Sequence, residues 1–187
     1  MRIISGKYRG KQFHLPGNFR ARPTTDFAKT GLFNIISNSF NFEEIEVLDL
    51  FSGTGSIGFE FASRGAAYVE MVEKNYLHFN FIKNTIANLK VDNVKVFKTD
   101  AFIYIPRINK KFDIIFADPP YEMIGIEKIP GLVLKYNLLK DQGLFIIEHS
   151  KDHDFADYPG FYKLRKYGNV SFSFFTNLTD TSSPVPS

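Results

Sequence analysis

The sequence Asp118-Pro119-Pro120-Tyr121 has the clearest potential for chemistry, and it follows directly on an apolar run from Phe112 to Ala117. Two consecutive prolines fix the backbone and lack N–H donors, which leaves their carbonyl oxygens as hydrogen-bond acceptors. A carboxylate and bare carbonyls beside an aromatic ring suit a planar substrate that carries an NH2 group. The alternative is a rigid turn that closes a strand, with Tyr121 as a surface aromatic.

Acidic residues also lie at the ends of other predicted strands. The strands are expected at 45–51, 67–73, 94–99 and 112–117, and the acids are Asp49, Glu73, Asp100 and Asp118. Strands that alternate with helices predict an open, mostly parallel sheet with helices on both faces. Such sheets bind ligands beyond the carboxyl ends of their strands, so we expect all four acids at one binding edge.

The remaining segments complete this α/β pattern. Helices are expected from Thr24 or Thr25 to Ser39, from the glycine-rich loop to Arg64, and around 79–89, 101–105 and 126–136, with a fifth strand at 143–148. Hairpins are predicted at both ends of the chain, from residues 2–5 with 11–15 and from 162–167 with 170–175. Gly31 should weaken the first helix by about 1 kcal/mol relative to alanine. We expect a basic hairpin extension (1–20), a catalytic domain (21–178) and a disordered tail (179–187).

A glycine-rich loop follows the first predicted strand. Gly53-x-Gly55-x-x-Gly58 matches the pattern by which a backbone approaches a dinucleotide at the start of a helix. Glu73 ends the next strand, where a carboxylate can accept both hydroxyls of a ribose; the alternative is an exposed strand-end acid. Asp49 favours an amino-bearing or cationic ligand over a pyrophosphate, and Asp100 suits an adenine 6-amino group. S-adenosylmethionine satisfies all three acids and is the predicted cofactor.

Composition limits the class of protein. The chain has 187 residues, 44% of them hydrophobic, and no cysteine. It therefore predicts one soluble globular domain in the cytoplasm, without disulfides or thiolate metal sites. No run approaches the roughly 20 apolar residues of a membrane span. His149-x3-His153 lacks a third ligand, so no metal is expected.

The net charge of +3 is unevenly distributed: residues 1–29 carry +6 and the rest of the chain −3. The basic side chains of this segment, opposed by Asp26 alone, are Arg2, Lys7, Arg9, Lys11, Arg20, Arg22 and Lys29. Tyr8, Phe13, His14 and Phe19 lie among them, as stacking on nucleic-acid bases would require. The segment therefore predicts a nucleic-acid partner, and the alternative is a solvated arm that only aids solubility.

Several of these motifs resemble those of known methyltransferases. The segment 47–58 is similar to motif I of class I methyltransferases, and Asp118-Pro119-Pro120-Tyr121 to motif IV of those that methylate exocyclic amines. The segments 2–10, 22–26 and 32–35, in this order with the other motifs, resemble the RsmD family of 16S ribosomal RNA (guanine(966)-N2)-methyltransferases. In the family, four residues usually follow the position of Asp26: Arg, an aliphatic residue, a basic residue (Lys or Arg) and Glu. This chain has Phe27-Ala28-Lys29-Thr30 instead. It lacks that Arg and Glu, so any contact that these two residues make in the family is not expected here.

The resemblance implies a Rossmann-like class I methyltransferase fold, with a mostly parallel seven-stranded sheet, helices on both faces and an N-terminal β-hairpin. It implies methylation of a guanine N2 amine in 16S ribosomal RNA or a small-subunit assembly intermediate. We also expect a monomer without a metal or membrane partner. Cofactor contacts are expected from Asp49, Phe51, Ser52, Gly53, Thr54, Gly55, Glu73, Lys74, Asp100, Ala101 and Asp118. RNA contacts are expected from Arg2, Lys7, Tyr8, Arg9, Lys11, Arg20 and Arg22.

The expected catalytic residues are Asp118, Pro119, Pro120 and Tyr121. Guanine N2 is a poor nucleophile because its lone pair is delocalised into the ring. The Asp118 carboxylate and the Pro119 carbonyl are expected to accept hydrogen bonds from the NH2 group, which orients the lone pair and stabilises developing positive charge. Tyr121 is expected to stack on a flipped base. Whether Asp118 takes the proton directly or passes it to water is open.

Four alternatives remain at this point. The same motif serves adenine-N6 methyltransferases of DNA, which usually add a target-recognition domain for which this chain has no room. It also serves glutamine-amide methyltransferases, which usually carry Asn at the position of Asp118. The glycine pattern alone would fit a nucleotide-dependent oxidoreductase. The fold could finally serve a non-catalytic RNA-binding assembly factor.

Overall fold

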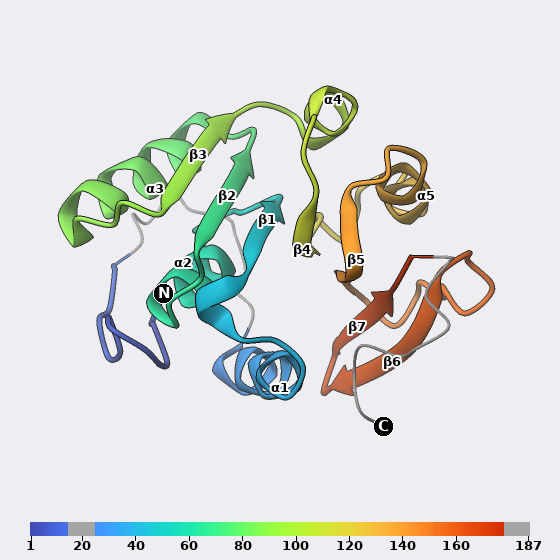
Figure 1. Cartoon of the computed structure of the whole chain (residues 1–187), viewed down its shortest axis with the longest axis horizontal. Coiled ribbons are helices and arrows are strands. Elements are labelled where there is room, and N and C mark those ends of the chain that lie inside the picture. The colour runs from blue at the N-terminus through green and yellow to red at the C-terminus, as the bar shows by residue number, and fades with distance from the viewer. Residues whose placement is uncertain (15–24, 178–187) are drawn as a thin grey trace.

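A seven-stranded sheet forms the centre of the molecule, with the strand order β3-β2-β1-β4-β5-β7-β6 (Figure 1). The computed structural model describes residues 1–14 and 25–177. Strands β1 to β5 are parallel to one another, whereas β7 is antiparallel to both β5 and β6. The chain order reverses between β1 and β4, which creates the topological switch point where such sheets bind ligands.

The elements follow the predicted alternation closely. The strands are β1 (Glu46–Leu50), β2 (Tyr68–Glu73), β3 (Val94–Lys98), β4 (Phe112–Ala117), β5 (Leu139–His149), β6 (Phe161–Tyr167) and β7 (Val170–Phe175). The helices are α1 (Asp26–Ser37), α2 (Ser56–Ser63), α3 (Tyr76–Leu89), α4 (Ala101–Tyr104) and α5 (Lys128–Lys135), with short 3-10 turns at Phe42–Glu44 and Ile105–Arg107. The predicted class of fold and the C-terminal hairpin are confirmed.

Boundaries differ from prediction by a few residues. Helix α1 starts as expected, because the Thr25 hydroxyl accepts the Ala28 N–H at 3.2 Å, but it ends at Ser37 rather than Ser39. Pro130 lies in the first turn of α5, where backbone N–H groups make no intrahelical hydrogen bond, so its lack of an N–H does not break the helix. Strand β5 begins at Leu139 rather than 143, because its first residues pair with the start of β4.

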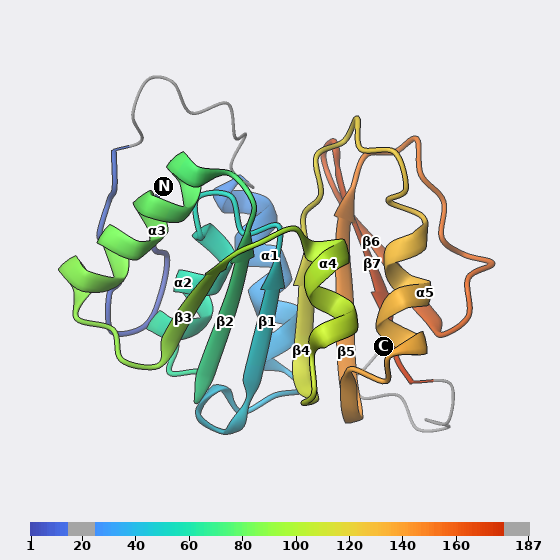
Figure 2. The same ribbon diagram turned by 90° about the horizontal axis from the view of Figure 1, so that it is seen from above.

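The central strands are buried on both faces because helices cover both sides of the sheet. Along β4, Ile114 and Phe116 join one apolar core with α1 and α2, whereas Ile115 and Ala117 join the other core with α4 and α5. Figure 2 shows α4 and α5 in front of the sheet and α1 and α2 behind it. This two-sided burial explains why the strand sequences are continuously apolar rather than alternating.

The predicted N-terminal hairpin is present and short. Its two arms meet at a single bridge between Arg2 and Gln12, supported by the Ile3 N–H bond to the Lys11 carbonyl at 3.0 Å. Ile3 is almost fully buried in the core of the α/β domain. The hairpin is therefore packed onto the sheet assembly rather than projecting as a free arm.

A buried ion pair connects this hairpin to α1 and α2. Lys29 Nζ lies 3.5 Å from Glu60 Oε2 and donates to the Arg2 carbonyl at 2.6 Å. The Glu60 carboxylate accepts the N–H groups of Ile4 and Ser5 at 2.8 and 3.0 Å. Burial lowers the pKa of Lys29, and the Glu60 charge opposes that shift. Lys29 therefore contributes nothing to a basic surface, which corrects the charge count made from the sequence.

In the parts of the chain that the structure describes, no helix is both long and apolar enough to cross a membrane. The predicted boundary between residues 20 and 21 and the predicted tail at 179–187 lie outside the described residues.

Replacement of Gly31 by alanine tests the packing of α1 against β6. A Cβ at Gly31 would lie 2.2 Å from the Tyr167 ring, whereas a Cβ at Gly131 in α5 meets nothing within 4 Å. We expect Gly31→Ala to destabilise the protein by about 1–3 kcal/mol through overpacking. Gly131→Ala should instead stabilise it by up to about 1 kcal/mol, the ordinary helix effect. Urea denaturation measures both, and a Gly31→Ala protein as stable as wild type would contradict this packing.

Candidate active site

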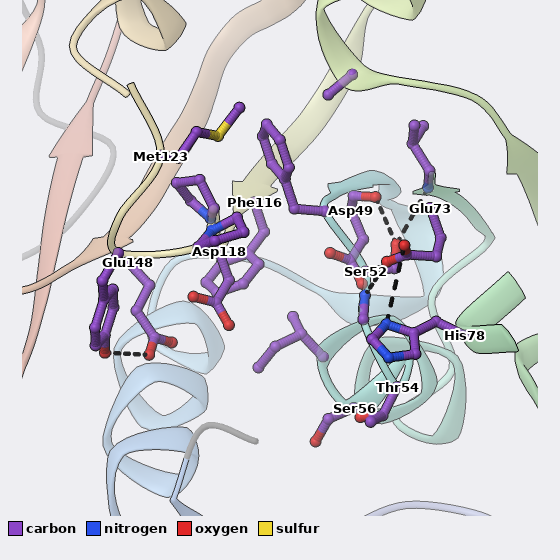
Figure 3. A pocket seen from close by; sticks show the side chains of 18 of the residues that line it. Asp49, Ser52, Thr54, Ser56, Glu73, His78, Phe116, Asp118, Met123 and Glu148 are labelled. Carbon is purple, nitrogen blue, oxygen red and sulfur yellow. Dashed lines mark hydrogen bonds and ion pairs between the residues drawn. The ribbon is translucent and has the colours of Figure 1, made fainter. Parts of the chain in front are cut away.

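A cavity of about 1250 Å³ lies at the carboxyl ends of the parallel strands (Figure 3). It is larger than the roughly 300–1,000 Å³ of most small-molecule pockets, so it has room for a cofactor and part of a substrate. Its lining includes all the predicted catalytic residues and every predicted cofactor residue except Gly55. These are Asp49, Phe51, Ser52, Gly53, Thr54, Glu73, Lys74, Asp100, Ala101, Asp118, Pro119, Pro120 and Tyr121.

The register of the sheet explains why these residues meet. Leu50 at the end of β1 pairs with Val72 of β2 and with Ala117 of β4. The segments that follow these three strands therefore leave the sheet at the same edge. The four strand-end acids line one cavity at this edge, as expected. Their roles in binding and catalysis stay proposals.

The glycine-rich loop turns sharply between β1 and α2. Phe51, Gly53 and Gly55 all have positive φ values, of 62°, 54° and 76°. Gly53 lines the cavity. Gly55 does not line it, because a Cβ there would meet the Phe59 ring at 2.7 Å rather than the cavity. The predicted contact of Gly55 with a cofactor thus has no support in the geometry, and the residue acts in packing α2.

Asp49 lies beneath this loop and is only 1% exposed. Its Oδ2 accepts the Gly58 N–H, at the start of α2, at 3.1 Å. Burial raises the pKa of Asp49 to about 8, an effect that the Glu73 charge reinforces and the bonds from Gly58 and Ser52 oppose. A cationic ligand beside Asp49 would favour its charged form.

Glu73 fixes the loop from the end of β2. One carboxylate oxygen accepts the Gly53 N–H at 2.7 Å and the other accepts the Asn75 N–H at 2.6 Å. Burial raises the pKa of Glu73, while these backbone bonds and the nearby His78 oppose the shift. Glu73 is therefore a buried, fixed acceptor, and the alternative of an exposed strand-end acid is wrong.

Asp100 caps the N-terminus of α4 and is held by two bonds. Its Oδ1 accepts the Phe102 N–H at 2.9 Å, and its Oδ2 accepts from Lys74 Nζ at 2.9 Å. Burial acts to raise the pKa of Asp100, but these bonds outweigh it and the pKa falls below its usual range. Asp100 is therefore charged at neutral pH and available as an acceptor.

Asp118 and Glu148 form the other end of the cavity, at the ends of β4 and β5. Figure 3 shows them together, across the cavity from Glu73 and His78. Burial raises the pKa of Asp118 well above its usual range, and the charges of Glu148 and Asp49 raise it further. The Tyr121 hydroxyl donates to Glu148 Oε1 at 3.4 Å. Glu148 was not among the predicted site residues, although its position at the end of a strand was a usable signal.

The sequence also gave no site role to the rim of the cavity. Phe27, which is 71% exposed, lines the cavity together with Tyr167 at the end of β6 and Asn169 in the β6–β7 turn. The rings of Phe27 and Tyr167 meet edge to face, with centroids 5.7 Å apart. These residues come from opposite ends of the chain, so no local motif could have joined them.

The predicted RNA-binding residues are distributed unevenly. Lys7, Arg9 and Lys11 are exposed on the hairpin, and Arg2 is half-exposed and paired with Asp26 at 2.7 Å. Arg20 and Arg22 lie outside the described residues.

Tyr8 is the exception among the predicted RNA contacts. It is only 9% exposed and packs in the core, and its backbone N–H donates to the Ser63 hydroxyl at 2.9 Å. Its ring therefore offers no face for base stacking, and the predicted RNA contact of Tyr8 is wrong.

Comparison with known proteins places the chain in a family. Residues 1–176 match the family described as Conserved hypothetical protein 95. The chain belongs to this family. Ribosomal RNA small subunit methyltransferase D of Buchnera aphidicola is 34% identical over 148 residues, which cover 79% of this chain and 75% of that protein.

Solved structures agree with the fold. The Escherichia coli candidate methyltransferase yhhF has a TM-score of 0.81 and 27% identity, over 94% of this chain and 96% of that one. A candidate methyltransferase solved with S-adenosylhomocysteine has a TM-score of 0.60 at 18% identity, over 79% of this chain and 49% of that one, and supports the fold alone. The predicted class I S-adenosylmethionine-dependent methyltransferase fold is confirmed.

Asp49→Asn tests the titration of the buried carboxyl group. An unfolded aspartate loses its proton near pH 4, about its model value, whereas the pKa of folded Asp49 is raised to about 8. Between these values the folded state binds more protons, so this residue makes the wild-type free energy of unfolding fall as pH rises. Asparagine does not titrate, so the variant should gain stability relative to wild type from pH 5 to 8, as measured by urea denaturation. A difference that is constant across this range would contradict the raised pKa.

Proposed function

We propose that the protein is an S-adenosylmethionine-dependent methyltransferase that methylates the N2 amine of a guanine in 16S ribosomal RNA, in the free RNA or in a small-subunit assembly intermediate. One observation carries the proposal: Asp118-Pro119-Pro120-Tyr121 shares a cavity with the glycine-rich loop, Asp49 and Glu73. The names of the relatives support ribosomal RNA as the substrate.

The donor end of the cavity fits S-adenosylmethionine in its chemistry. Glu73 is fixed where it can accept ribose hydroxyls, Asp100 can accept an adenine amine, and Asp49 would be stabilised in its charged form by a cationic amino acid. Phe51 and Ala101 add apolar lining around the same region. When bound, the cofactor supplies a methyl group activated on a sulfonium.

At the acceptor end, Asp118 would hold and deprotonate the guanine amine. Its carboxylate and the Pro119 carbonyl can accept hydrogen bonds from the NH2 group, which orients the nitrogen and offsets its growing positive charge. The raised pKa of Asp118 makes it a stronger base than an ordinary aspartate, as a group that receives the proton of the methylated amine requires. Tyr121 is 39% exposed and offers a ring for the flipped base.

The hairpin would contact the RNA outside the cavity. Lys7, Arg9 and Lys11 are exposed there, and the Lys7 N–H bond to the Ser63 carbonyl at 2.7 Å anchors the hairpin to the C-terminal end of α2. The cavity lies at the N-terminal end of α2, about 12 Å away at 1.5 Å per residue. A structured RNA spans this distance, so the hairpin charges fit contacts to phosphates that flank the target.

Asp118→Asn should lower the rate of methyl transfer to 16S RNA by about 100-fold or more, because the charge that stabilises the amine and accepts its proton is lost. The assay follows labelled methyl from S-adenosylmethionine into RNA. Asp113→Asn is the matched control: it lies near the other end of β4, ion-paired with Lys140 at 2.8 Å, and should keep near-normal transfer.

Near-normal transfer by Asp118→Asn would contradict the role of Asp118. A wild-type protein that binds the RNA but never labels it would overturn the proposed enzyme and favour the RNA-binding assembly factor.

Charge reversal on the hairpin tests the RNA surface. We expect Lys7→Glu with Arg9→Glu to weaken RNA binding by about tenfold or more at low salt. The dependence of affinity on salt should also become less steep, because a protein that contacts fewer phosphates releases fewer counterions when it binds. Lys135→Glu with Lys151→Glu, two exposed lysines in α5 and after β5, is the matched control for net charge. Equal losses in both double variants would point to a general charge effect and contradict a hairpin contact.

A further inference from the structure

We propose that Glu148 reads the edge of the acceptor base and selects guanine over adenine, by accepting hydrogen bonds from guanine N1–H and N2–H. The proposal rests on the proposed function, since it concerns the substrate of the same cavity. It gives a role to a buried carboxylate that the donor and acceptor contacts described above leave unused.

The sheet places Glu148 beside Asp118. Ala117 of β4 pairs with Ile147 of β5, so the next residue in each strand lies at the same level of the sheet. Ala117 and Ile147 point into the core that contains α5, and alternation therefore turns Asp118 and Glu148 to the opposite face, toward the cavity. Figure 3 shows the two carboxylates near each other.

Glu148 is also fixed and shielded. It is 3% exposed and lines the cavity, and its Oε1 accepts a hydrogen bond from the Tyr121 hydroxyl at 3.4 Å. A carboxylate has about four acceptor positions, so Glu148 can accept several hydrogen bonds at once. If Tyr121 stacks on the base, the hydroxyl contact holds Glu148 close to the plane in which the base presents its edge.

The two purines present different edges to such a carboxylate. Guanine offers N1–H and the N2 amine side by side, a pair of donors that one carboxylate can accept together. Adenine offers its N6 amine next to N1, which is an acceptor and would face the carboxylate lone pairs. With Glu148 on N1–H and one N2–H, the second N2–H remains for Asp118 or the Pro119 carbonyl. Two carboxylates at this end of the cavity therefore match guanine and oppose adenine.

The test uses a base that keeps the reacting amine and loses N1–H. In a 16S RNA fragment, 2-aminopurine replaces the guanine that the wild-type protein methylates. We expect wild type to prefer guanine over 2-aminopurine by about 10- to 100-fold in kcat/KM, because a buried acceptor then loses its donor. The same preference should appear in the Kd of the fragment, measured by fluorescence anisotropy without cofactor.

Glu148→Gln should reduce this preference to less than threefold, because a glutamine amide can donate to N1 of 2-aminopurine. Glu70→Gln is the matched control: Glu70 is 5% exposed, accepts the Tyr68 and Tyr104 hydroxyls, and lies outside the cavity lining. It should keep the full preference. Tyr121→Phe keeps the ring but removes the hydroxyl that orients Glu148, so it should lower the preference for guanine by less than Glu148→Gln does. This difference separates reading of the base edge by Glu148 from stacking by the ring.

The outcomes separate this inference from the function on which it rests. Methylation of guanine N2 by wild type with equal use of 2-aminopurine, or a full preference retained by Glu148→Gln, would overturn the role of Glu148 and leave the proposed function intact. Absence of methyl transfer to any RNA by wild type would overturn both.

Discussion

The parallel pairing of β1 with β2 on one side and with β4 on the other brings Asp49, Glu73 and Asp118 to one edge of the sheet. Leu50 lies between Val72 and Ala117, so the chain leaves the sheet three times at one edge, where the order of strands reverses. Neither the glycine-rich loop nor the Pro-Pro turn forms a site alone. The register joins them, and a shift by one residue would turn Asp49 and Asp118 away from each other.

This arrangement concentrates acids where the fold would otherwise be apolar. The charges of Asp49 and Glu148 both act on Asp118, and burial disfavours the charged forms of Asp49 and Asp118. Such a cluster destabilises the protein without its ligands and favours a cationic or amino-bearing partner. The buried Lys29–Glu60 pair acts differently, because both charges are matched and the hairpin backbone bonds to the same carboxylate. One cluster is therefore suited to ligands, whereas the other fixes the N-terminal segment.

Much of this structure could be predicted from the sequence, because the buried strands are continuous apolar runs with polar residues at their ends. The class of fold, both hairpins and the meeting of the strand-end acids followed from that pattern. Burial of single residues did not: Tyr8 and Lys29 look like surface residues in a basic segment, but the core and the Glu60 carboxylate hold them. Gly31 looked like a weak point of its helix, whereas the Tyr167 ring requires its lack of a side chain. Such contacts join distant parts of the chain, so no local pattern contains them.

The proposed function requires a methyl donor and an amino-bearing base at opposite ends of one cavity, and its most specific consequence is the identity of the methylated atom. Mass spectrometry of nucleosides from 16S ribosomal RNA, compared between cells with and without this gene, identifies that atom. One N2-methylguanosine should disappear when the gene is absent and return with the wild-type protein. An unchanged set of methylated guanines, or the loss of an N6-methyladenosine instead, would contradict it.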